Sequence, residues 1–229
     1  MTAMETLRYG SEPSQFVELH GTPGGRGTAI LLHGGWWRAR HDLHQFDPMA
    51  ENLAVAGWYV ANVEYRRIDG DTGGWPQTLD DVLAAVAAVS PLASRPTVAI
   101  GHSAGGHLAL LAGKRLGLSG VIALAPITDV PRAREEELGE GAAALFLTGD
   151  DPAASPLRQL PIGCPQVVVQ GDADVRVPVG HSQDYVAAAV AAGDDVEYVE
   201  LPGVDHFRLI NPADKPWQPA RAWLDRRFS

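Results

Sequence analysis

From residue 28 to the end of the chain, short apolar runs alternate with longer Ala/Leu-rich stretches that have helical periodicity. This alternation is typical of βαβ units, in which helices connect the parallel strands of one sheet. The expected strands are Thr28–Leu32, Trp58–Glu64, Thr97–Ile100, Gly120–Leu124, Gln166–Gln170 and Val196–Glu200. The expected helices are His44–Ala56, Gln77–Val89, Ala104–Leu116, Val179–Ala192 and Ala213–Arg226. We therefore predict an α/β fold with a mostly parallel central sheet and helices on both faces, preceded by antiparallel strands from residues 5–20.

One segment interrupts this alternation. Between Pro126 and Pro161 the chain is rich in Pro, Gly and charged residues, and it is longer than a simple crossover requires. The whole chain has 229 residues, a length at which one domain is the usual outcome. We expect a single domain over residues 1–229 with a short lid-like insertion at about 127–161.

Charge and cysteine content narrow the range of partners and compartments. The formal net charge is −10, so a nucleic acid or an anionic membrane surface would be repelled. The only cysteine, Cys164, cannot form an intramolecular disulfide, and the first residues contain no basic and apolar leader. We expect a cytoplasmic protein that acts on a small-molecule substrate, and we leave a homodimer open.

The motif Gly101-His102-Ser103-Ala104-Gly105 lies between an expected strand and an expected helix. A G-x-S-x-G sequence in this context is typical of a nucleophile elbow, a tight turn that raises the serine hydroxyl clear of the sheet. The alternative is a glycine-rich turn that binds phosphate, but neither G-x-G-x-x-G nor a P-loop is present. We predict that Ser103 is a nucleophile.

The loop His33-Gly34-Gly35-Trp36 follows the expected strand Thr28–Leu32. Stabilising an oxyanion requires backbone N–H groups that converge on one point, and glycines allow the chain to approach that closely. We predict that Gly35, Trp36 and Ala104 supply these groups. An ordinary β-turn after the strand is the alternative.

An acid and a base are expected after later strands, in the order serine, aspartate, histidine. Asp172 and Asp174 follow Gln166–Gln170, and His206 follows Val196–Glu200. Spacing alone does not choose between the two aspartates. His206 would be the general base.

Two further pairs of histidines do not indicate a metal site. His41 and His44 have a spacing that a metal site can use, but no carboxylate or cysteine pattern completes a zinc motif. His102 and His107 flank the elbow and suit packing or pocket lining. We expect no metal and no cofactor.

Together these segments resemble the esterase and arylformamidase branches of the α/β-hydrolases over almost the whole chain. His33-Gly34-Gly35-Trp36-Trp37 is similar to the HGGYW loop of kynurenine formamidases, with Trp36 in place of Tyr, and residues 101–108 are similar to their GHSAGAHL elbow, with Gly106 in place of Ala. Their G-x-x-D-x-x-V-P stretch aligns with residues 171–178, which implies that Asp174 is the acid. Val63-Glu64-Tyr65-Arg66 and Ala154-Ser155-Pro156-Leu157 resemble further family segments.

The resemblance implies an α/β-hydrolase fold and a serine hydrolase that forms an acyl-enzyme intermediate. We expect an aryl formamide such as N-formylkynurenine as the leading substrate, with Trp37 and Phe146 as aromatic walls of its pocket. A carboxylesterase for small substrates is the first alternative. A non-catalytic binding protein with the same fold is the second.

Overall fold

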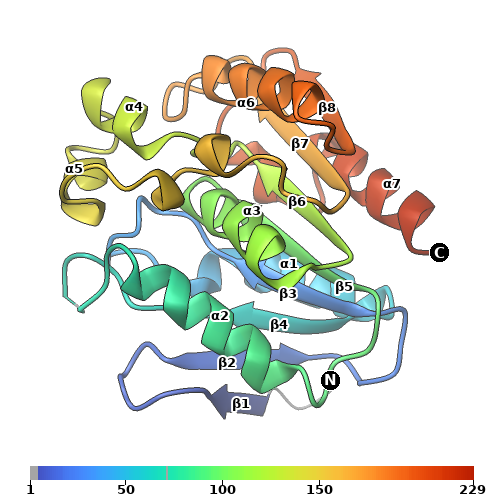
Figure 1. Cartoon of the computed structure of the whole chain (residues 1–229). Coiled ribbons are helices and arrows are strands. Elements are labelled where there is room, and N and C mark those ends of the chain that lie inside the picture. Colours follow the sequence, from blue (N-terminus) through green and yellow to red (C-terminus); the bar gives the residue numbers. More distant parts are fainter. Residues whose placement is uncertain (1–4, 71) are drawn as a thin grey trace.

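The computed structural model describes residues 5–70 and 72–229, and within them eight strands form one sheet (Figure 1). The strand order is β1-β2-β4-β3-β5-β6-β7-β8. β1 and β2 pair in antiparallel fashion with each other, β2 pairs antiparallel with β4, and the other neighbours are parallel. The strands are β1 (Glu5–Arg8), β2 (Phe16–His20), β3 (Thr28–Leu32), β4 (Tyr59–Val63), β5 (Thr97–His102), β6 (Gly120–Leu124), β7 (Gln166–Gly171) and β8 (Val196–Leu201). The predicted mostly parallel sheet and its antiparallel beginning are confirmed.

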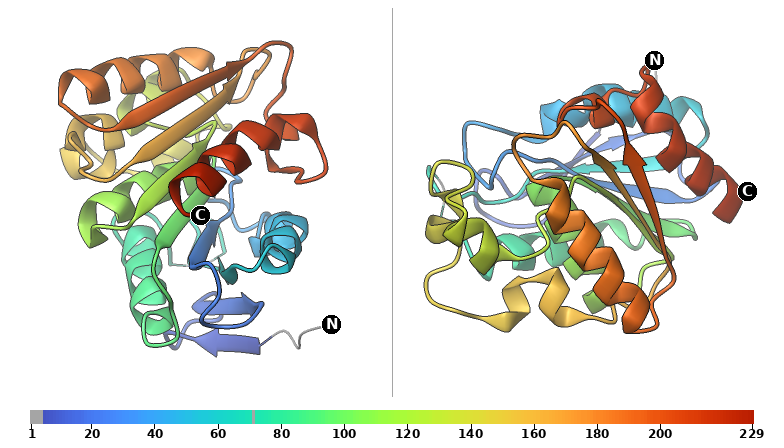
Figure 2. Two further views of the ribbon diagram at one scale, coloured as in Figure 1. Left: turned by 90° about the vertical axis from the view of Figure 1, so that its right-hand side faces the viewer. Right: turned by 90° about the horizontal axis from the view of Figure 1, so that it is seen from above.

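Helices cover both faces of this sheet, as predicted. Figure 2 shows α2, α3 and α6 on one face and α1 and α7 on the other. The long helices are α1 (Asp47–Val55), α2 (Gln77–Val89), α3 (Ala104–Leu116), α6 (Val179–Ala191) and α7 (Gln218–Arg227). None of the helices within the described ranges combines the length and the hydropathy needed to cross a bilayer.

Two of the predicted helices begin later than expected. The stretch His44–Ala56 divides into a 3-10 turn, Leu43–Phe46, and α1, while α7 begins only after the 3-10 turn Lys215–Trp217. In both helices a proline occupies the first turn. Proline lacks an N–H donor and fits the first turn, where no donor is needed, so it favours a helix start at these points.

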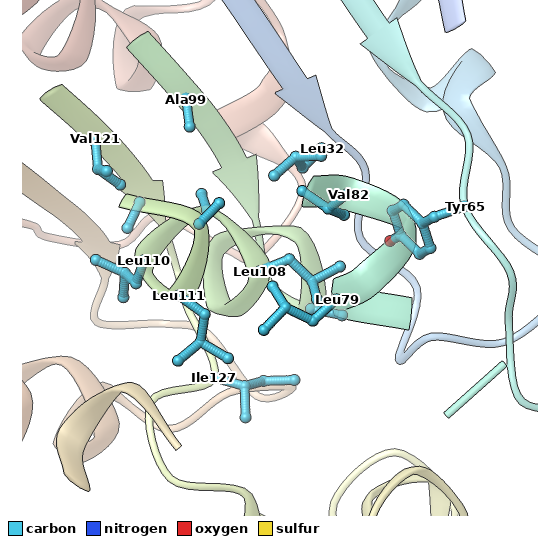
Figure 3. Packing of buried hydrophobic residues seen from close by; sticks show 14 of the residues in the cluster. Leu32, Tyr65, Leu79, Val82, Ala99, Leu108, Leu110, Leu111, Val121 and Ile127 are labelled. Atoms are coloured by element: carbon cyan, nitrogen blue, oxygen red, sulfur yellow. The ribbon is translucent and has the colours of Figure 1, made fainter. Parts of the chain in front are cut away.

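Most of the parallel strands are buried on both faces, which explains their apolar sequences, whereas the edge strand β8 is partly exposed. Every residue of β3, β4, β6 and β7 is buried. One apolar cluster lies between the sheet and α2, α3 and α6, and a second lies between the sheet and α1 and α7. Figure 3 shows part of the first cluster, where Leu108 of α3 lies beside Leu79 of α2. Burial of each such side chain stabilises the fold by roughly 1.5–3 kcal/mol.

The interrupting segment folds into short elements beside the end of the sheet (Figure 1). They are α4 (Val130–Glu135), α5 (Ala142–Phe146) and the 3-10 turns Pro152–Ala154 and Pro156–Gln159. The segment is attached to α3, because His107 Nε2 donates a hydrogen bond of 2.7 Å to the carbonyl of Ala154.

Candidate active site

The predicted site residues follow β3, β5, β7 and β8, whose carboxyl ends lie at one edge of the sheet. In open α/β sheets this edge is where ligands bind. A cavity of about 250 Å³ lies there, lined by Gly35, Trp36, Arg40, His41, His102, Ser103, Glu140, Arg176, His206 and Phe207. The structure therefore places the predicted nucleophile, the predicted base and the predicted oxyanion loop around one cavity. Glu140 belongs to the interrupting segment, which thus forms part of the wall.

Ser103 lies on a strained turn between β5 and α3. Its backbone has φ 56° and ψ −118°, a conformation that costs a non-glycine residue about 1–3 kcal/mol. The turn needs both flanking glycines, since a Cβ on Gly101 would lie 2.1 Å from the Gly105 carbonyl, and one on Gly105 would lie 1.9 Å from the Leu32 carbonyl. The Ser103 hydroxyl is buried and makes no hydrogen bond to any residue in the described ranges. It is therefore available to a substrate in the cavity.

Asp174 and His206 form a buried pair. Asp174 Oδ2 lies 2.6 Å from His206 Nδ1, and the two residues are 8% and 5% exposed. Asp174 Oδ1 also accepts hydrogen bonds from the backbone N–H groups of Arg176, at 2.8 Å, and Val177, at 3.0 Å. Burial raises the pKa of Asp174, but the contact with His206 and these N–H donors outweigh it and lower the pKa below the ordinary value. The carboxylate is thus held ionised beside the imidazole.

The neighbouring aspartates have different surroundings. Asp172 is exposed and its Oδ1 accepts a hydrogen bond of 2.6 Å from Gly203 N–H, so it links the loops after β7 and β8. Asp205 accepts hydrogen bonds from the N–H groups of Phe207 and Arg208. Spacing left Asp172 and Asp174 open, and the structure places only Asp174 against the histidine.

The loop after β3 brings backbone donors next to Ser103. Gly35 and Trp36 have φ values of 102° and 56°, and a Cβ on Gly34 would lie 3.2 Å from Ser103 Cβ. Within residues 5–70 and 72–229, the N–H groups of Gly35, Trp36 and Ala104 have no acceptor. Ala104 is the first residue of α3, whose dipole places partial positive charge at this end. These groups are free to bind an oxyanion.

A second buried pair supports this loop from behind. Glu64 Oε1 lies 3.0 Å from His33 Nε2, and Glu64 also accepts hydrogen bonds from the N–H groups of Tyr65 and Leu43. The ring of Tyr65 stacks on His33 at 4.2 Å, and its hydroxyl donates to the His33 carbonyl. Sequence reasoning quoted Glu64 and Tyr65 only as part of a resemblance and missed this role. A glutamate at the end of an apolar strand was the available signal, because a buried carboxylate needs partners.

His102 holds the loop that carries the proposed base. Its Nε2–H donates a 2.9 Å hydrogen bond to the carbonyl of His206, and the two ring centroids are 4.3 Å apart. Burial, followed by the proximity of His206, keeps the pKa of His102 well below the ordinary histidine value. His102 is therefore neutral and fixes the position of the His206 loop.

The expectation that Trp37 and Phe146 contact the substrate needs correction. Both are buried, at 0% and 2% exposure, and neither lines the cavity. Their rings stack at 4.0 Å, so they attach the interrupting segment to the loop after β3. Sequence reasoning missed that Arg40, Arg176 and Phe207 occupy the cavity wall instead.

The spacing of His41 and His44 does not make a shared site. His41 lines the cavity, whereas His44 is exposed and pairs with Asp47 at 3.0 Å. Glu18, His44 and Asp47 have ligand atoms within 4.8 Å of one another, but none of the three lines the cavity. This group is therefore separate from the candidate active site.

Known structures share this architecture. Thermogutta terrifontis esterase 2, in a form phosphonylated by sarin, superposes with a TM-score of 0.83 and 21% identity, covering 99% of this chain and 95% of that chain. A truncated carbohydrate esterase from gut microbiota superposes with a TM-score of 0.81 and 18% identity, covering 99% and 96%. The chain has the α/β-hydrolase fold.

Sequence comparisons match shorter regions of the chain. The family model described as BD-FAE matches residues 23–122, which include the loop after β3 and the elbow. The versiconal hemiacetal acetate esterase of Aspergillus parasiticus is 42% identical over 120 residues, covering 48% of this chain and 37% of that protein. The match thus spans little more than a third of the curated relative's length.

Proposed function

We propose that this protein is a serine carboxylesterase for small substrates. The observation that carries the proposal is the free, buried hydroxyl of Ser103 on a strained elbow, beside the same cavity as His206 and its partner Asp174. A buried polar group without a partner and a strained backbone both lower stability, so their coincidence at a cavity favours a catalytic role.

The proposed reaction has two steps. Ser103 Oγ attacks the ester carbonyl while His206 accepts its proton, and the same imidazole then gives that proton to the departing alcohol. A water molecule, deprotonated by His206, then attacks the acyl carbonyl, and the imidazole returns that proton to Ser103 Oγ as the bond between Oγ and the acyl carbon breaks and the carboxylic acid leaves. Asp174 fixes the imidazole orientation and stabilises its charged form.

The free N–H groups of Gly35, Trp36 and Ala104 would bind the oxyanion of both tetrahedral intermediates. Loss of one such donor costs about 2.7–4 kcal/mol of transition-state stabilisation. Because Gly35 and Trp36 hold unusual backbone conformations, their donors are in place before the substrate arrives.

The names of the relatives support an ester substrate over a formamide. The relative from A. parasiticus is named as an acetate esterase, and the superposed structures are named as esterases. The predicted preference for aryl formamides such as N-formylkynurenine has no support from these comparisons, whereas the first alternative has. The unbonded Ser103 hydroxyl and the Asp174–His206 pair at one cavity also argue against a binding protein without activity, because binding alone does not need them.

A chromogenic acetate ester tests the proposal. We expect a burst of product followed by steady turnover, and we expect an organophosphate to label Ser103 and stop both. Ser103→Ala should lower kcat by about 10⁶-fold, the scale seen when a triad serine is lost. Ser155→Ala is the matched control, because Ser155 is equally buried but hydrogen-bonds to Val130 N–H outside the cavity. Full activity of Ser103→Ala would overturn the proposal, and faster hydrolysis of N-formylkynurenine than of any ester would restore the formamidase interpretation.

A further inference from the structure

The cavity beside Ser103 presents two arginine side chains in an otherwise acidic protein. The chain has a net charge of −10, yet the cavity wall contains Arg40 and Arg176, with Glu140 as its one acidic residue. A cavity with low-dielectric walls concentrates the field of such charges toward the ligand. The charges at the cavity wall therefore affect which substrates bind.

The side chain of Arg176 pairs with no carboxylate among the described residues. Within the described part of the chain, its guanidinium makes no hydrogen bond or ion pair, and it lies 5.4 Å over the ring of Phe207. Its backbone is fixed, because its N–H donates to Asp174 beside His206. A free guanidinium is thus held at the cavity wall within two residues of the proposed acid.

Arg40 is paired, but weakly. Its guanidinium lies 3.3 Å from Glu140, with side chains 52% and 70% exposed, and an exposed pair of this kind contributes only about 0–1 kcal/mol. Between the arginines, burial and then the charge of Arg40 lower the pKa of His41, which keeps that imidazole neutral. An entering anion can therefore compete with Glu140 for Arg40, and the neutral His41 adds no charge of its own to the cavity wall.

We propose that this cavity selects esters whose acyl or alcohol part carries a carboxylate, with Arg176 as the main binding residue and Arg40 as the second. This inference rests on the proposed esterase function. An arginine binds a carboxylate through two parallel hydrogen bonds, and its charge attracts the substrate toward Ser103. Phe207 supports the guanidinium from one side and leaves its edge free for the ligand.

Two matched substrate pairs test the inference. The pair 3-acetoxybenzoate and phenyl acetate places the carboxylate on the leaving side, and the pair monoethyl glutarate and ethyl butyrate places it on the acyl side. We expect the wild type to favour the anionic member of at least one pair by about tenfold in kcat/KM, the scale of one charge-assisted hydrogen bond. Arg176→Gln should lower the anionic-to-neutral ratio by about tenfold, and Arg40→Gln by less.

Arg221→Gln is the control. Arg221 is on α7, pairs with Asp225 and does not line the cavity, so this change alters net charge equally without altering the ratio. Hydrolysis of the neutral esters with ratios near one, or an equal fall of both rates in Arg176→Gln, would overturn the inference and leave the esterase proposal standing. Failure to hydrolyse any of the four esters would overturn both.

Discussion

Two buried carboxylate–histidine pairs lie at the same end of the sheet, and their surroundings differ. Asp174 and His206 are 2.6 Å apart, and His206 lines the cavity that also contains Ser103. Glu64 and His33 are 3.0 Å apart, and His33 is fully buried against Tyr65, away from the cavity.

The comparison shows that the pair itself does not determine its role. A histidine that borders the cavity can exchange a proton with substrate, whereas a histidine enclosed by backbone and an aromatic ring can only hold its loop in position. We therefore propose a chemical role for the first pair and a positioning role for the second. Variants that remove one carboxylate at a time separate these roles.

Among the carboxylate variants, the largest effect is expected from Asp174→Asn. Losing the carboxylate leaves His206 without its orienting and stabilising partner, so kcat should fall by about 10⁴-fold. Asp172→Asn is the control, because Asp172 is exposed and accepts a hydrogen bond from Gly203 N–H instead of contacting His206. Steady-state kinetics on the two folded variants measure these losses. A larger loss of kcat in Asp172→Asn than in Asp174→Asn would assign the acid to Asp172.

A smaller loss of activity is expected from Glu64→Gln. This change preserves shape but removes the charge that holds His33, so the oxyanion loop should shift and kcat should fall by up to about 10²-fold. The free energy of unfolding should also fall, by about 3 kcal/mol, because the buried pair is broken.

KM and the rate of organophosphate labelling distinguish positioning from folding in Glu64→Gln. We expect kcat to change more than KM, because the oxyanion contacts form mainly in the transition state. A variant that is less stable but keeps the full kcat would show that the Glu64 pair supports only the fold.

A third buried histidine, His107, has no carboxylate partner among the described residues and shows how burial alone affects an imidazole. Burial lowers its pKa to about 4, although its hydrogen bond to Ala154 acts in the opposite direction. The unfolded chain therefore binds a proton that the folded chain does not, so stability falls as pH decreases from 6.5 toward 4, by about 3 kcal/mol in total.

Urea unfolding of wild type and His107→Gln between pH 7.5 and pH 4 measures this contribution, which should be absent from the variant. His44 gives the contrasting control: its contact with Asp47 outweighs partial burial and raises its pKa, so its contribution to stability has the opposite pH dependence. Identical pH profiles for wild type and His107→Gln would contradict the assignment of a neutral, buried His107.

The last prediction concerns the chemical reactivity of Cys164. This thiol is buried and has no cationic partner in the part of the chain that the structure describes. Burial, followed by the charge of Asp194, raises the pKa of its thiol to about 11. At pH 8 the folded protein should react with a thiol reagent at least about 10²-fold more slowly than the unfolded chain, because so little thiolate is present. Rapid modification of the folded protein without loss of activity would contradict this burial.

The local sequence was sufficient to predict the strands and the elbow of this protein. The sequence predicted the six strands β3 to β8 within one or two residues, and for β3, β4, β6 and β7 the reason is that strands buried on both faces need apolar sequence. Gly101 and Gly105 predicted the tight elbow, and the structure shows that a Cβ at either position would collide with backbone. The roles of Ser103, Asp174 and His206 remain predictions that kinetics must test.

The tertiary structure determines which side chains lie beside these motifs. Trp36 and Trp37 are adjacent in sequence, but only Trp36 reaches the cavity, because Trp37 packs against Phe146 from more than 100 residues away. Spacing left Asp172 and Asp174 open and the resemblance implied Asp174, and the loop after β8 places His206 beside Asp174. Neighbouring residues in a loop face different directions, and only the packing of distant segments determines which of them contacts the substrate, a buried partner or solvent.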